Sequence, residues 1–515
     1  MKNFKTAGII FLIILIVAYK QINAQSQQQI FWPSLMNSPW PMSKHDPQGT
    51  GRSDFPGPKN PSIAWTKDME YGIMSGPVID SNEFLYFGTS TSLIFSDTLN
   101  YFYSLNNKGE LLWTFYTFNG DPNSSGLLIS ADSTIYFCSL EYLYAIDLTG
   151  NLKWTYKTNS LQIHQWLTNI GREGNIYSVN FDGYLNCINN SGSLNWQKKY
   201  DSGFWTNSPV FSPDGETIYI AGTDSNLYAL NLDGSLKWKF ISDKASAIPA
   251  VDNQGNIYFV SKLDSTGLFS LNQDGTLRWS YNFANLNFSG PVFLSPTIDK
   301  EGNIIFPAPQ PQKSKIISVD YYGNFNWEYV FEADDEAIFS PLICDSEGTI
   351  YCGSTWGYNF YAISNHGNLL WKLPLDGYQV DNSGAIGSDG TLYIGTHLGS
   401  LVTGQKRTLI AIRDTVTSVS GNEEMIKSFK LEQNYPNPFN ASTVIKYSIP
   451  NGSPVVVKLI IYDILGNEIA TLVNNEQFPG EYEVRFNPSN ISSGIYFYKL
   501  TAGNYTDIKK LILLK

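Results

Sequence analysis

A short pattern, Gly-x-Leu-x-Trp, recurs through most of this 515-residue sequence and constrains its fold more than any other feature. Seven copies share one spacing, with Phe replacing Leu in one of them, and their glycines are Gly109, Gly150, Gly192, Gly234, Gly275, Gly323 and Gly367. An eighth copy, Pro61-x-Ile63-x-Trp65, lacks only the glycine. The eight tryptophans lie 41 to 48 residues apart. A fixed period of this length is typical of repeat architectures.

Each repeat contains the signals of four short β-strands. The glycine favours a tight hairpin, and Leu and Trp two positions apart should share one face of the strand that follows. An earlier strand ends in Leu or Ile followed by Tyr, as at Ile218-Tyr219, and the next places a small residue between apolar ones, as at Ala229. The first strand is a run such as 248–251. Four strands in roughly 44 residues predict a propeller blade.

The two ends of the array predict how the ring closes. The last repeat, from about Val380 to Arg413, has three strand signals and no Gly-x-Leu-x-Trp. The first copy, Ile63 to Trp65, is a fourth strand with no hairpin before it, so it needs no glycine. We therefore expect the N-terminal strand to complete the last blade, which removes two exposed sheet edges. The predicted fold is an all-β, eight-bladed propeller of four-stranded blades.

The repeat resembles that of the pyrroloquinoline-quinone-type (PQQ-like) propellers. The run Leu-Tyr-Ala-Leu-Asn-Leu-Asp-Gly-Ser-Leu-Lys-Trp at Leu227 to Trp238 carries the resemblance, which extends over about Trp40 to Arg413. This superfamily includes quinoprotein dehydrogenases and the propeller subunit of the outer-membrane protein assembly machine. The resemblance implies the fold, and we assign residues 40–414 to the propeller.

The N-terminus has the features of a secretory signal over residues 1–24. Lys2 and Lys5 precede an apolar or glycine run from Ala7 to Ala18, and cleavage is expected between Ala24 and Gln25. The alternative is a membrane anchor, but this run is shorter than the roughly 20 residues that span a bilayer. No other segment could span, so we expect no transmembrane helix in the mature form. Residues 25–39 form an N-terminal segment before the propeller.

Charge excludes one class of partner. The formal net charge is −12, and it becomes −15 once the three lysines of the signal are removed. Affinity for nucleic acid depends on Lys and Arg at phosphates, and the sequence has no basic cluster, so we expect no nucleic-acid partner.

The C-terminal segment differs from the repeats. Polar residues 415–427 form a linker, and alternating short strands and turns over residues 428–515 predict a small immunoglobulin-like β-sandwich. The runs Tyr435-Pro-Asn-Pro-Phe-Asn440, Tyr462-Asp-Ile-Leu-Gly466 and Ser493-Gly-Ile-Tyr496 resemble the type A sorting domain of the type IX secretion system. The resemblance implies Sec export, then type IX export by a Bacteroidetes-type bacterium, with the type IX machinery as partner. An ordinary adhesive sandwich is the alternative.

Residues that could carry chemistry do not form a recognisable catalytic or metal site. The four histidines are not spaced as zinc ligands. The Asp-x-x-Gly runs at Asp252, Asp299 and Asp345 could hold calcium, but a turn with Asp first and Gly last explains them without a metal. The quinoprotein dehydrogenases carry an adjacent cysteine pair that this chain lacks, so we predict no cofactor.

The four cysteines allow two interpretations. An even number in an exported protein is compatible with disulfides, and Cys344–Cys352 is one pairing. Burial as small apolar residues explains all four as well, since Cys187 occupies the position of the small residue in its repeat.

Loops on one end of the propeller are the best candidates for binding. The short hairpins between first and second and between third and fourth strands lie on one end, here called the first face. The variable loops lie on the opposite end, the second face, with Trp166, Trp205 and Trp356 in or beside them. Aromatic side chains on variable loops suit a sugar ring or a protein contact, although they could also pack over the blade ends.

These observations predict an exported, non-enzymatic propeller that binds or scaffolds at the cell surface or outside the cell. A surface enzyme, either a quinone-dependent dehydrogenase or a polysaccharide-cleaving propeller, is the alternative. A periplasmic assembly factor is a third reading, which the sorting domain opposes.

Overall fold

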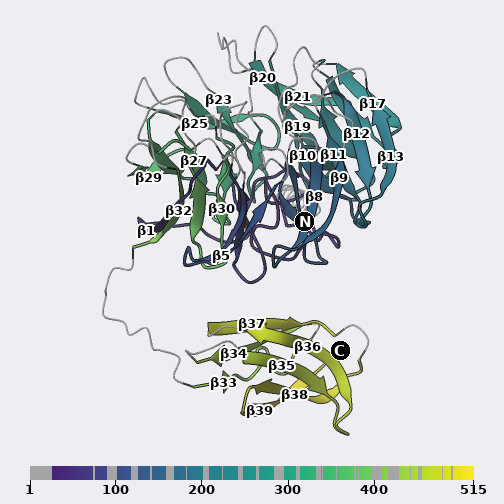
Figure 1. Ribbon diagram of the computed structural model, residues 1–515, viewed down its shortest axis with the longest axis vertical. Helices are drawn as coiled ribbons and strands as arrows, with labels where there is room; N and C mark the ends of the chain where they lie inside the picture. Colours follow the sequence, from purple (N-terminus) through teal and green to yellow (C-terminus); the bar gives the residue numbers. More distant parts are fainter. Residues whose placement is uncertain are drawn as a thin grey trace, which may run out of the picture. The chain divides into compact units, whose positions relative to one another are not determined.

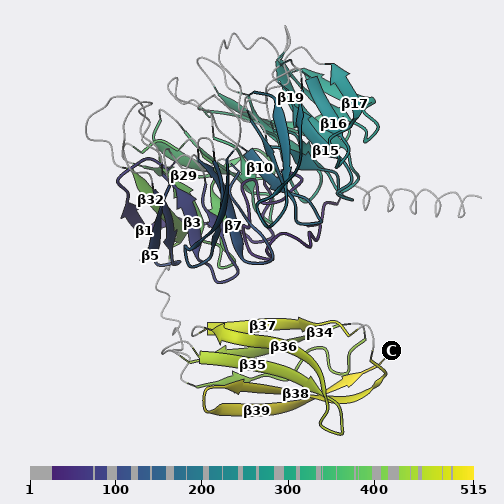
Figure 2. The same cartoon turned by 45° about the vertical axis from the view of Figure 1, so that its right-hand side comes forward.

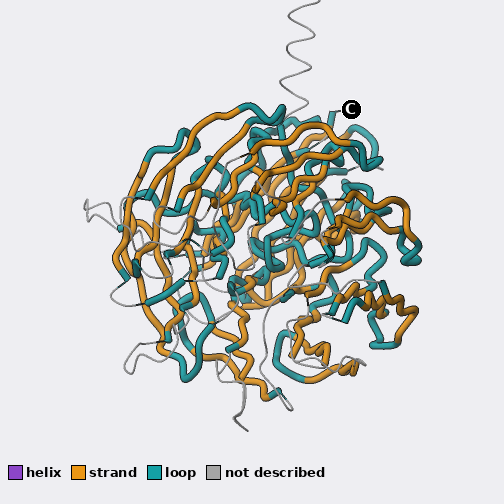
Figure 3. The backbone as a smooth tube through the Cα atoms, turned by 90° about the horizontal axis from the view of Figure 1, so that it is seen from above, coloured by secondary structure: helices purple, strands orange, loops and turns teal. Residues whose placement is uncertain are grey.

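The computed structural model divides the chain into two compact units, residues 1–415 and 416–515. It describes residues 26–514 except 74–75, 90–100, 118–125, 140–141, 158–166, 181, 201–207, 223, 225, 242–247, 263–265, 283–294, 309–313, 332–337, 339, 355–356, 376–377, 381, 397–406, 416–427, 441, 451–454, 478–479 and 489–490. The described residues form strands and loops, with no helix among them (Figure 3). The predicted all-β class is confirmed.

The described part of the first unit contains eight four-stranded antiparallel sheets (Figures 1 and 2). The first strands are β2 (Val78–Ile79), β6 (Leu128–Ile129), β10 (Leu167–Ile170), β14 (Val210–Phe211), β18 (Ala250–Val251), β22 (Thr297–Ile298), β26 (Ile343–Cys344) and β30 (Ala385–Ile386). The second strands are β3 (Leu85–Gly88), β7 (Thr134–Ser139), β11 (Ile176–Val179), β15 (Ile218–Ala221), β19 (Ile257–Lys262), β23 (Ile304–Ala308), β27 (Ile350–Gly353) and β31 (Leu392–Gly395).

The third and fourth strands complete each blade. The third strands are β4 (Tyr101–Leu105), β8 (Tyr142–Asp147), β12 (Tyr184–Ile188), β16 (Asn226–Leu230), β20 (Thr266–Leu271), β24 (Lys315–Val319), β28 (Asn359–Ile363) and β32 (Thr408–Asp414). The fourth strands are β5 (Leu111–Tyr116), β9 (Leu152–Lys157), β13 (Leu194–Lys199), β17 (Leu236–Ile241), β21 (Leu277–Asn282), β25 (Phe325–Val330), β29 (Leu369–Pro374) and β1 (Pro61–Asp68).

The N-terminal strand closes the ring as the repeat pattern predicts. β1 pairs antiparallel with β32, so the last sheet has the order β1-β32-β31-β30 (Figure 2). Its register runs from Pro61 opposite Asp414 to Asp68 opposite Thr408. Strands from the two ends of the propeller sequence therefore share one sheet.

A row of three residues crosses each blade and explains the small residue of the third strand. In the first blade Tyr86 on β3 lies opposite Ser104 on β4, and Ser104 lies opposite Trp113 on β5. Because serine is small, the Tyr86 and Trp113 rings approach across it, with their centroids 5.8 Å apart. Six further blades repeat the Tyr–Trp contact, and their centroids are 5.6 to 6.1 Å apart.

The predicted shared face for Leu and Trp is wrong, because a β-bulge separates them in every copy. Leu111 lies opposite Leu105 while Trp113 lies opposite Ser104, so two steps along β5 match one step along β4. The extra residue turns Leu111 to the opposite face from Trp113, and Leu111 is 50% exposed. The same register shift occurs in the other seven sheets.

The glycine and the tryptophan of the pattern join neighbouring blades. Gly192 has a φ of +83°, and a Cβ placed there would lie 2.6 Å from Cδ2 of Trp154 in the preceding blade. The same Trp154 donates a hydrogen bond from Nε1 to the carbonyl of Asn190, 2.9 Å away. Each of the seven motif glycines faces the tryptophan of the preceding blade in this way. Trp371 of the seventh blade donates instead to the carbonyl of Pro58, just before β1.

The second unit is a small β-sandwich of two sheets (Figure 1). One sheet has the order β33-β34-β37, and the other has the order β36-β35-β38-β39. The strands are β33 (Lys430–Leu431), β34 (Thr443–Ile449), β35 (Val455–Tyr462), β36 (Glu468–Gln477), β37 (Gly480–Phe486), β38 (Gly494–Ala502) and β39 (Tyr505–Leu513). Alternate residues of β35 and β38, such as Leu459 and Tyr498, point into the apolar core between the sheets.

The interblade contact predicts that Gly192→Ala destabilises the propeller more than Gly174→Ala does. Both glycines have a positive φ, +83° and +89°, so alanine strains the backbone at either position. Only Gly192 also faces an indole ring, whereas nothing lies within 4 Å of a Cβ at Gly174. We expect Gly192→Ala to cost about 1 to 3 kcal/mol more, as overpacking typically does. Denaturant unfolding of the two variants measures the difference, and equal losses would contradict the contact.

Candidate functional site in the central channel and on the second face

Residues 36–55, here called the channel segment, line the inside of the propeller, where the first strands of the sheets face a central channel. Six first strands donate the amide of their last residue to carbonyls of this segment between Trp40 and Gly51, at 2.8 to 3.0 Å. The pairs are Ile79 to Trp40, Ile129 to Pro41, Phe211 to Pro47, Val251 to Gln48, Ile298 to Thr50 and Cys344 to Gly51. The segment therefore follows the blades in their order around the ring. It satisfies inner-edge amides that would otherwise lack a partner.

In the third blade, a side chain and not a carbonyl of the segment accepts the amide of the first strand's last residue. Asn169 on β10 accepts a hydrogen bond at Oδ1 from the amide of Ile170. Its Nδ2 donates to the carbonyls of Pro47 and Pro209, at 3.0 and 2.8 Å. Asn169 thus takes the place of a backbone contact and holds the segment against the blade.

Two glycines and an arginine allow the segment to lie close to the inner strands of the blades. Gly49 and Gly51 have φ values of +69° and +66°, and a Cβ on Gly51 would lie 3.1 Å from the carbonyl oxygen of Leu342. Arg52 is buried and donates from its guanidinium to the carbonyls of Ile298 and Asp299, at 3.2 and 3.3 Å. The glycines therefore let the backbone of the segment approach the blades, and Arg52 satisfies carbonyls of the sixth blade.

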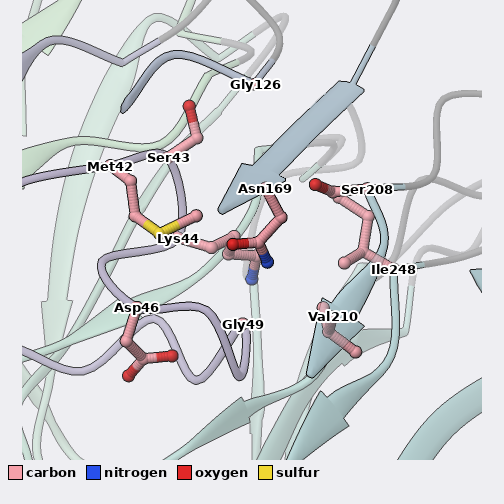
Figure 4. Close-up of a pocket in the computed structure, with 10 residues that line it drawn as sticks. All are labelled: Met42, Ser43, Lys44, Asp46, Gly49, Gly126, Asn169, Ser208, Val210 and Ile248. Atoms are coloured by element: carbon pink, nitrogen blue, oxygen red, sulfur yellow. The ribbon is translucent and has the colours of Figure 1, made fainter. Parts of the chain in front are cut away.

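A small cavity of about 30 Å³ lies between the segment and the second to fifth blades (Figure 4). Met42, Ser43, Lys44 and Asp46 line it from the segment, and the opposite wall comprises Gly126, Asn169, Ser208, Val210 and Ile248, with Gly49 beside them. Lys44 is 6% exposed, and its Nζ is buried without a hydrogen-bond partner. Burial lowers the pKa of Lys44 from 10.5 to about 8, although the charge of Asp46 opposes this shift.

The charged residues beside the cavity do not form a catalytic triad. Asp46 accepts hydrogen bonds from the amide and the hydroxyl of Thr50, and its carboxylate lies 3.7 Å from Nδ1 of His45. Burial acts to raise the pKa of Asp46, but the His45 ring and Thr50 outweigh it and the pKa is lowered. The Thr50 hydroxyl donates to Asp46 and not to His45, so no activated nucleophile results. The His45 ring packs edge-on against Trp40, with centroids 4.8 Å apart.

The channel does not fit the quinone cofactor of the dehydrogenases that share this repeat. Trp40 to Ser53 fill the position on the axis, and nearly all of these residues are buried. The cavity beside Lys44 has a volume of about 30 Å³, compared with roughly 300 to 1,000 Å³ for ordinary cofactor and ligand sites.

The Asp-x-x-Gly runs are turns, as the sequence predicts. Asp252 accepts the amides of Gln254 and Asn256 at Oδ1, and the Tyr258 hydroxyl and the Asn256 amide group at Oδ2. Burial raises the pKa of the equivalent Asp299 to about 6. Within the described ranges, no group of three or more His, Cys, Asp or Glu side chains could hold a metal ion.

The four cysteines are buried, and none of them forms a disulfide. Cys344 on β26 lies opposite Ile350 and not opposite Cys352. Burial as small apolar side chains is the interpretation that the structure confirms.

The residues that the sequence predicts for ligand binding and signal cleavage lie outside the described residues. This applies to Trp166, Trp205 and Trp356 and to Ala24 and Gln25. The ends of the described strands do fix which loops share the second face, because each sheet is antiparallel and its strands follow in order.

Sequence reasoning missed the channel segment. Its residues lack the repeat period, so nothing in the array pattern assigned them a place. The run from Pro41 to Ser53, with two prolines and two glycines before the first strand, was the available signal. Such residues fix φ or permit a positive φ, and both serve a chain that must follow a curved wall.

Comparisons with known families agree with this architecture. Residues 433–514 match the model of the secretion system C-terminal sorting domain. Residues 181–415 match a PQQ-like model described as outer membrane protein assembly factor BamB. The chain joins a PQQ-like propeller to a type IX sorting domain. The sorting domain marks the protein for type IX secretion, which delivers it to the medium or to the outer cell surface.

Solved structures share the propeller fold at low sequence identity. The Dos1 propeller is 10% identical, with a TM-score of 0.51, over 70% of this chain and 99% of that chain. BamB from Moraxella catarrhalis is 14% identical, with a TM-score of 0.49, over 68% of this chain and 97% of that chain. No curated protein matches the sequence. No helix in the described parts of the chain is long and apolar enough to cross a membrane.

The channel contacts predict that deleting residues 26–55 destabilises the propeller severely. The deletion removes the acceptors of six inner-edge amides and the core contacts of Trp32 and Trp40. Each lost hydrogen bond costs about 0.5 to 1.5 kcal/mol, and the lost apolar burial adds to this. Thermal unfolding of the purified chain measures the loss. A melting temperature within a few degrees of the intact protein would show that the segment is dispensable.

The Lys44 site predicts a pH dependence that Lys44→Met removes. The folded state disfavours the charged amine, so the unfolded chain binds this proton more readily between pH 8 and 10.5. The intact protein should gain stability relative to Lys44→Met as the pH rises through this window. At pH 7 the variant should be more stable by about 1 to 3 kcal/mol. A difference in unfolding free energy that stays constant from pH 7 to 10.5 would contradict this.

Proposed function

We propose that this protein is an exported, non-enzymatic PQQ-like propeller that binds or scaffolds an extracellular glycan or protein. The observation that carries the proposal is the filled channel. Segment 40–53 lies where quinoprotein dehydrogenases hold their cofactor. Within it, Asp46 accepts a hydrogen bond from Thr50, and Arg52 donates to the carbonyl of Ile298 in the sixth blade. Binding then falls to the loops of the second face, where Trp166, Trp205 and Trp356 are the proposed contact residues.

A surface enzyme is the second candidate. A polysaccharide-cleaving propeller needs two carboxyl groups placed about a glycosidic bond. Asp46 in the channel segment, and Asp299 and Asp345 directly after first strands, each accept hydrogen bonds from neighbouring amides. This arrangement favours the binding role, since acceptors already engaged by the backbone are turn and anchoring groups.

Export through the sorting domain is tested by deleting residues 428–515. The protein should be expressed in a bacterium that has a type IX system, with and without this domain. We expect the intact protein in the medium or on washed cells, and the deleted form in the periplasm. Equal export of both forms would overturn the proposed route.

Binding at the second face is tested on the purified mature protein. We expect Trp166→Ala, Trp205→Ala and Trp356→Ala together to lower affinity for a panel of surface polysaccharides and outer-surface proteins about ten-fold or more, as loss of aromatic hot spots does. Tyr322→Ala, an exposed aromatic on the first face, is the matched control. Unchanged binding by the triple variant would contradict the assignment of the second face.

A further inference from the structure

The hairpin between β35 and β36 in the sorting domain exposes two large apolar side chains at its tip. Ile464 is 71% exposed and Leu465 is 81% exposed. Among the described residues, the other neighbouring pairs of large exposed apolar side chains are much less exposed, at 50% and 43% for Leu111 and Leu112. An exposed apolar pair is unfavourable in water unless it serves a contact.

Hydrogen bonds fix the backbone of the turn that carries these two side chains. Asp463 accepts hydrogen bonds at Oδ1 from the amides of Leu465 and Asn467, at 2.8 and 2.9 Å. Its Oδ2 accepts a further bond from Nδ2 of Asn467 at 2.8 Å. Gly466 completes the turn with a φ of +83°. A turn fixed in this way presents its tip with little conformational entropy left to lose on binding.

The same hairpin occurs in the propeller, which provides an internal comparison. At Asp320, Oδ1 accepts the amides of Tyr322 and Asn324, and Oδ2 accepts Nδ2 of Asn324, as at Asp463. Seven such hairpins join third and fourth strands. The residue that matches Leu465 is polar in six of them, namely Lys108, Thr149, Ser191, Asp233, Asp274 and His366. The turn itself therefore does not require an apolar tip.

The propeller hairpins also have a partner within the molecule. In six of them the residue that matches Ile464 accepts, at its carbonyl, the Nε1 hydrogen bond of a neighbouring tryptophan. The sorting domain repeats the backbone geometry, but its tip side chains face solvent. Exposed apolar side chains on a rigid turn are typical of a contact with another molecule.

We propose that Ile464 and Leu465 form an apolar knob that enters an apolar recess of the export machinery when it recognises the folded sorting domain. This inference rests on the proposed export through residues 428–515 and names the contact within them. Large aliphatic side chains on a rigid turn provide affinity through burial of apolar surface. Asp463 and Asn467 are positioning residues that hold the knob.

The test replaces the tip with one that the same turn already carries elsewhere in the chain. Ile464→Asn with Leu465→Ser copies the Asn190-Ser191 pair of the third-blade hairpin. In a type IX host, we expect the full-length double variant to be exported about ten-fold less than the intact protein, as loss of a hot spot predicts. It should accumulate in the periplasm with an unchanged melting temperature. The matched control, Tyr322→Ser, alters the equivalent tip in the propeller and should be exported normally.

A conservative variant and the melting temperatures separate a role in recognition from a role in folding. The conservative variant Ile464→Leu with Leu465→Met should restore export, because the knob requires apolar volume. Normal export of the Asn-Ser variant would contradict the proposed contact with the export machinery. A change in its oligomeric state would not alter that conclusion. Lost export of the conservative variant, or a lowered melting temperature of the Asn-Ser variant, also overturns it by assigning both residues to folding. If the form lacking residues 428–515 is exported as well as the intact protein, the export route itself is wrong.

Discussion

The contact between the tryptophan of one blade and the glycine of the next is the interaction on which the propeller depends. A single blade is a four-stranded sheet that buries its faces only against its neighbours. The indole lies against the bare Cα of a glycine and donates Nε1 to a carbonyl in the same hairpin, so one side chain supplies both packing and a hydrogen bond. The bulge beside the tryptophan and the small residue opposite it serve this contact, since they give the ring its orientation and its space.

Closing the ring pairs the strands from the two ends of the array, but it leaves the first strand of every blade as an inner sheet edge. The first strands face the channel with amides that no neighbouring strand can accept. Carbonyls between Trp40 and Gly51 accept these amides in the order of the blades, so the channel is filled by the chain's own backbone. This arrangement places Lys44, His45, Asp46 and Arg52 where water cannot reach them freely. Arg52 and Asp46 find acceptors and donors, while the Lys44 amine finds none and its pKa falls.

The repeat pattern predicted the propeller and its closure because both follow from local rules that recur in register. The pairing of β1 with β32 could be read from one missing glycine and one missing strand. The face of Leu111 could not, since a bulge adds one residue to a strand without any signature in composition. The channel segment could not be placed either, because its contacts are made to six distant strands and have no period. For the same reason the sequence placed binding only on variable loops and gave no weight to the axis or to the exposed tip at Ile464.

The claim that this segment fills the channel can be tested directly by hydrogen exchange with mass spectrometry on the mature protein. Peptides that cover residues 36–55 and the first strands at Ile79, Phe211, Ile298 and Cys344 should be protected together, on the timescale of the blade interiors. Exchange of residues 36–55 within seconds, while the blades remain protected, would show that the channel is open. Such rapid exchange would contradict the filled channel, and the axis of the propeller would then be a candidate binding site.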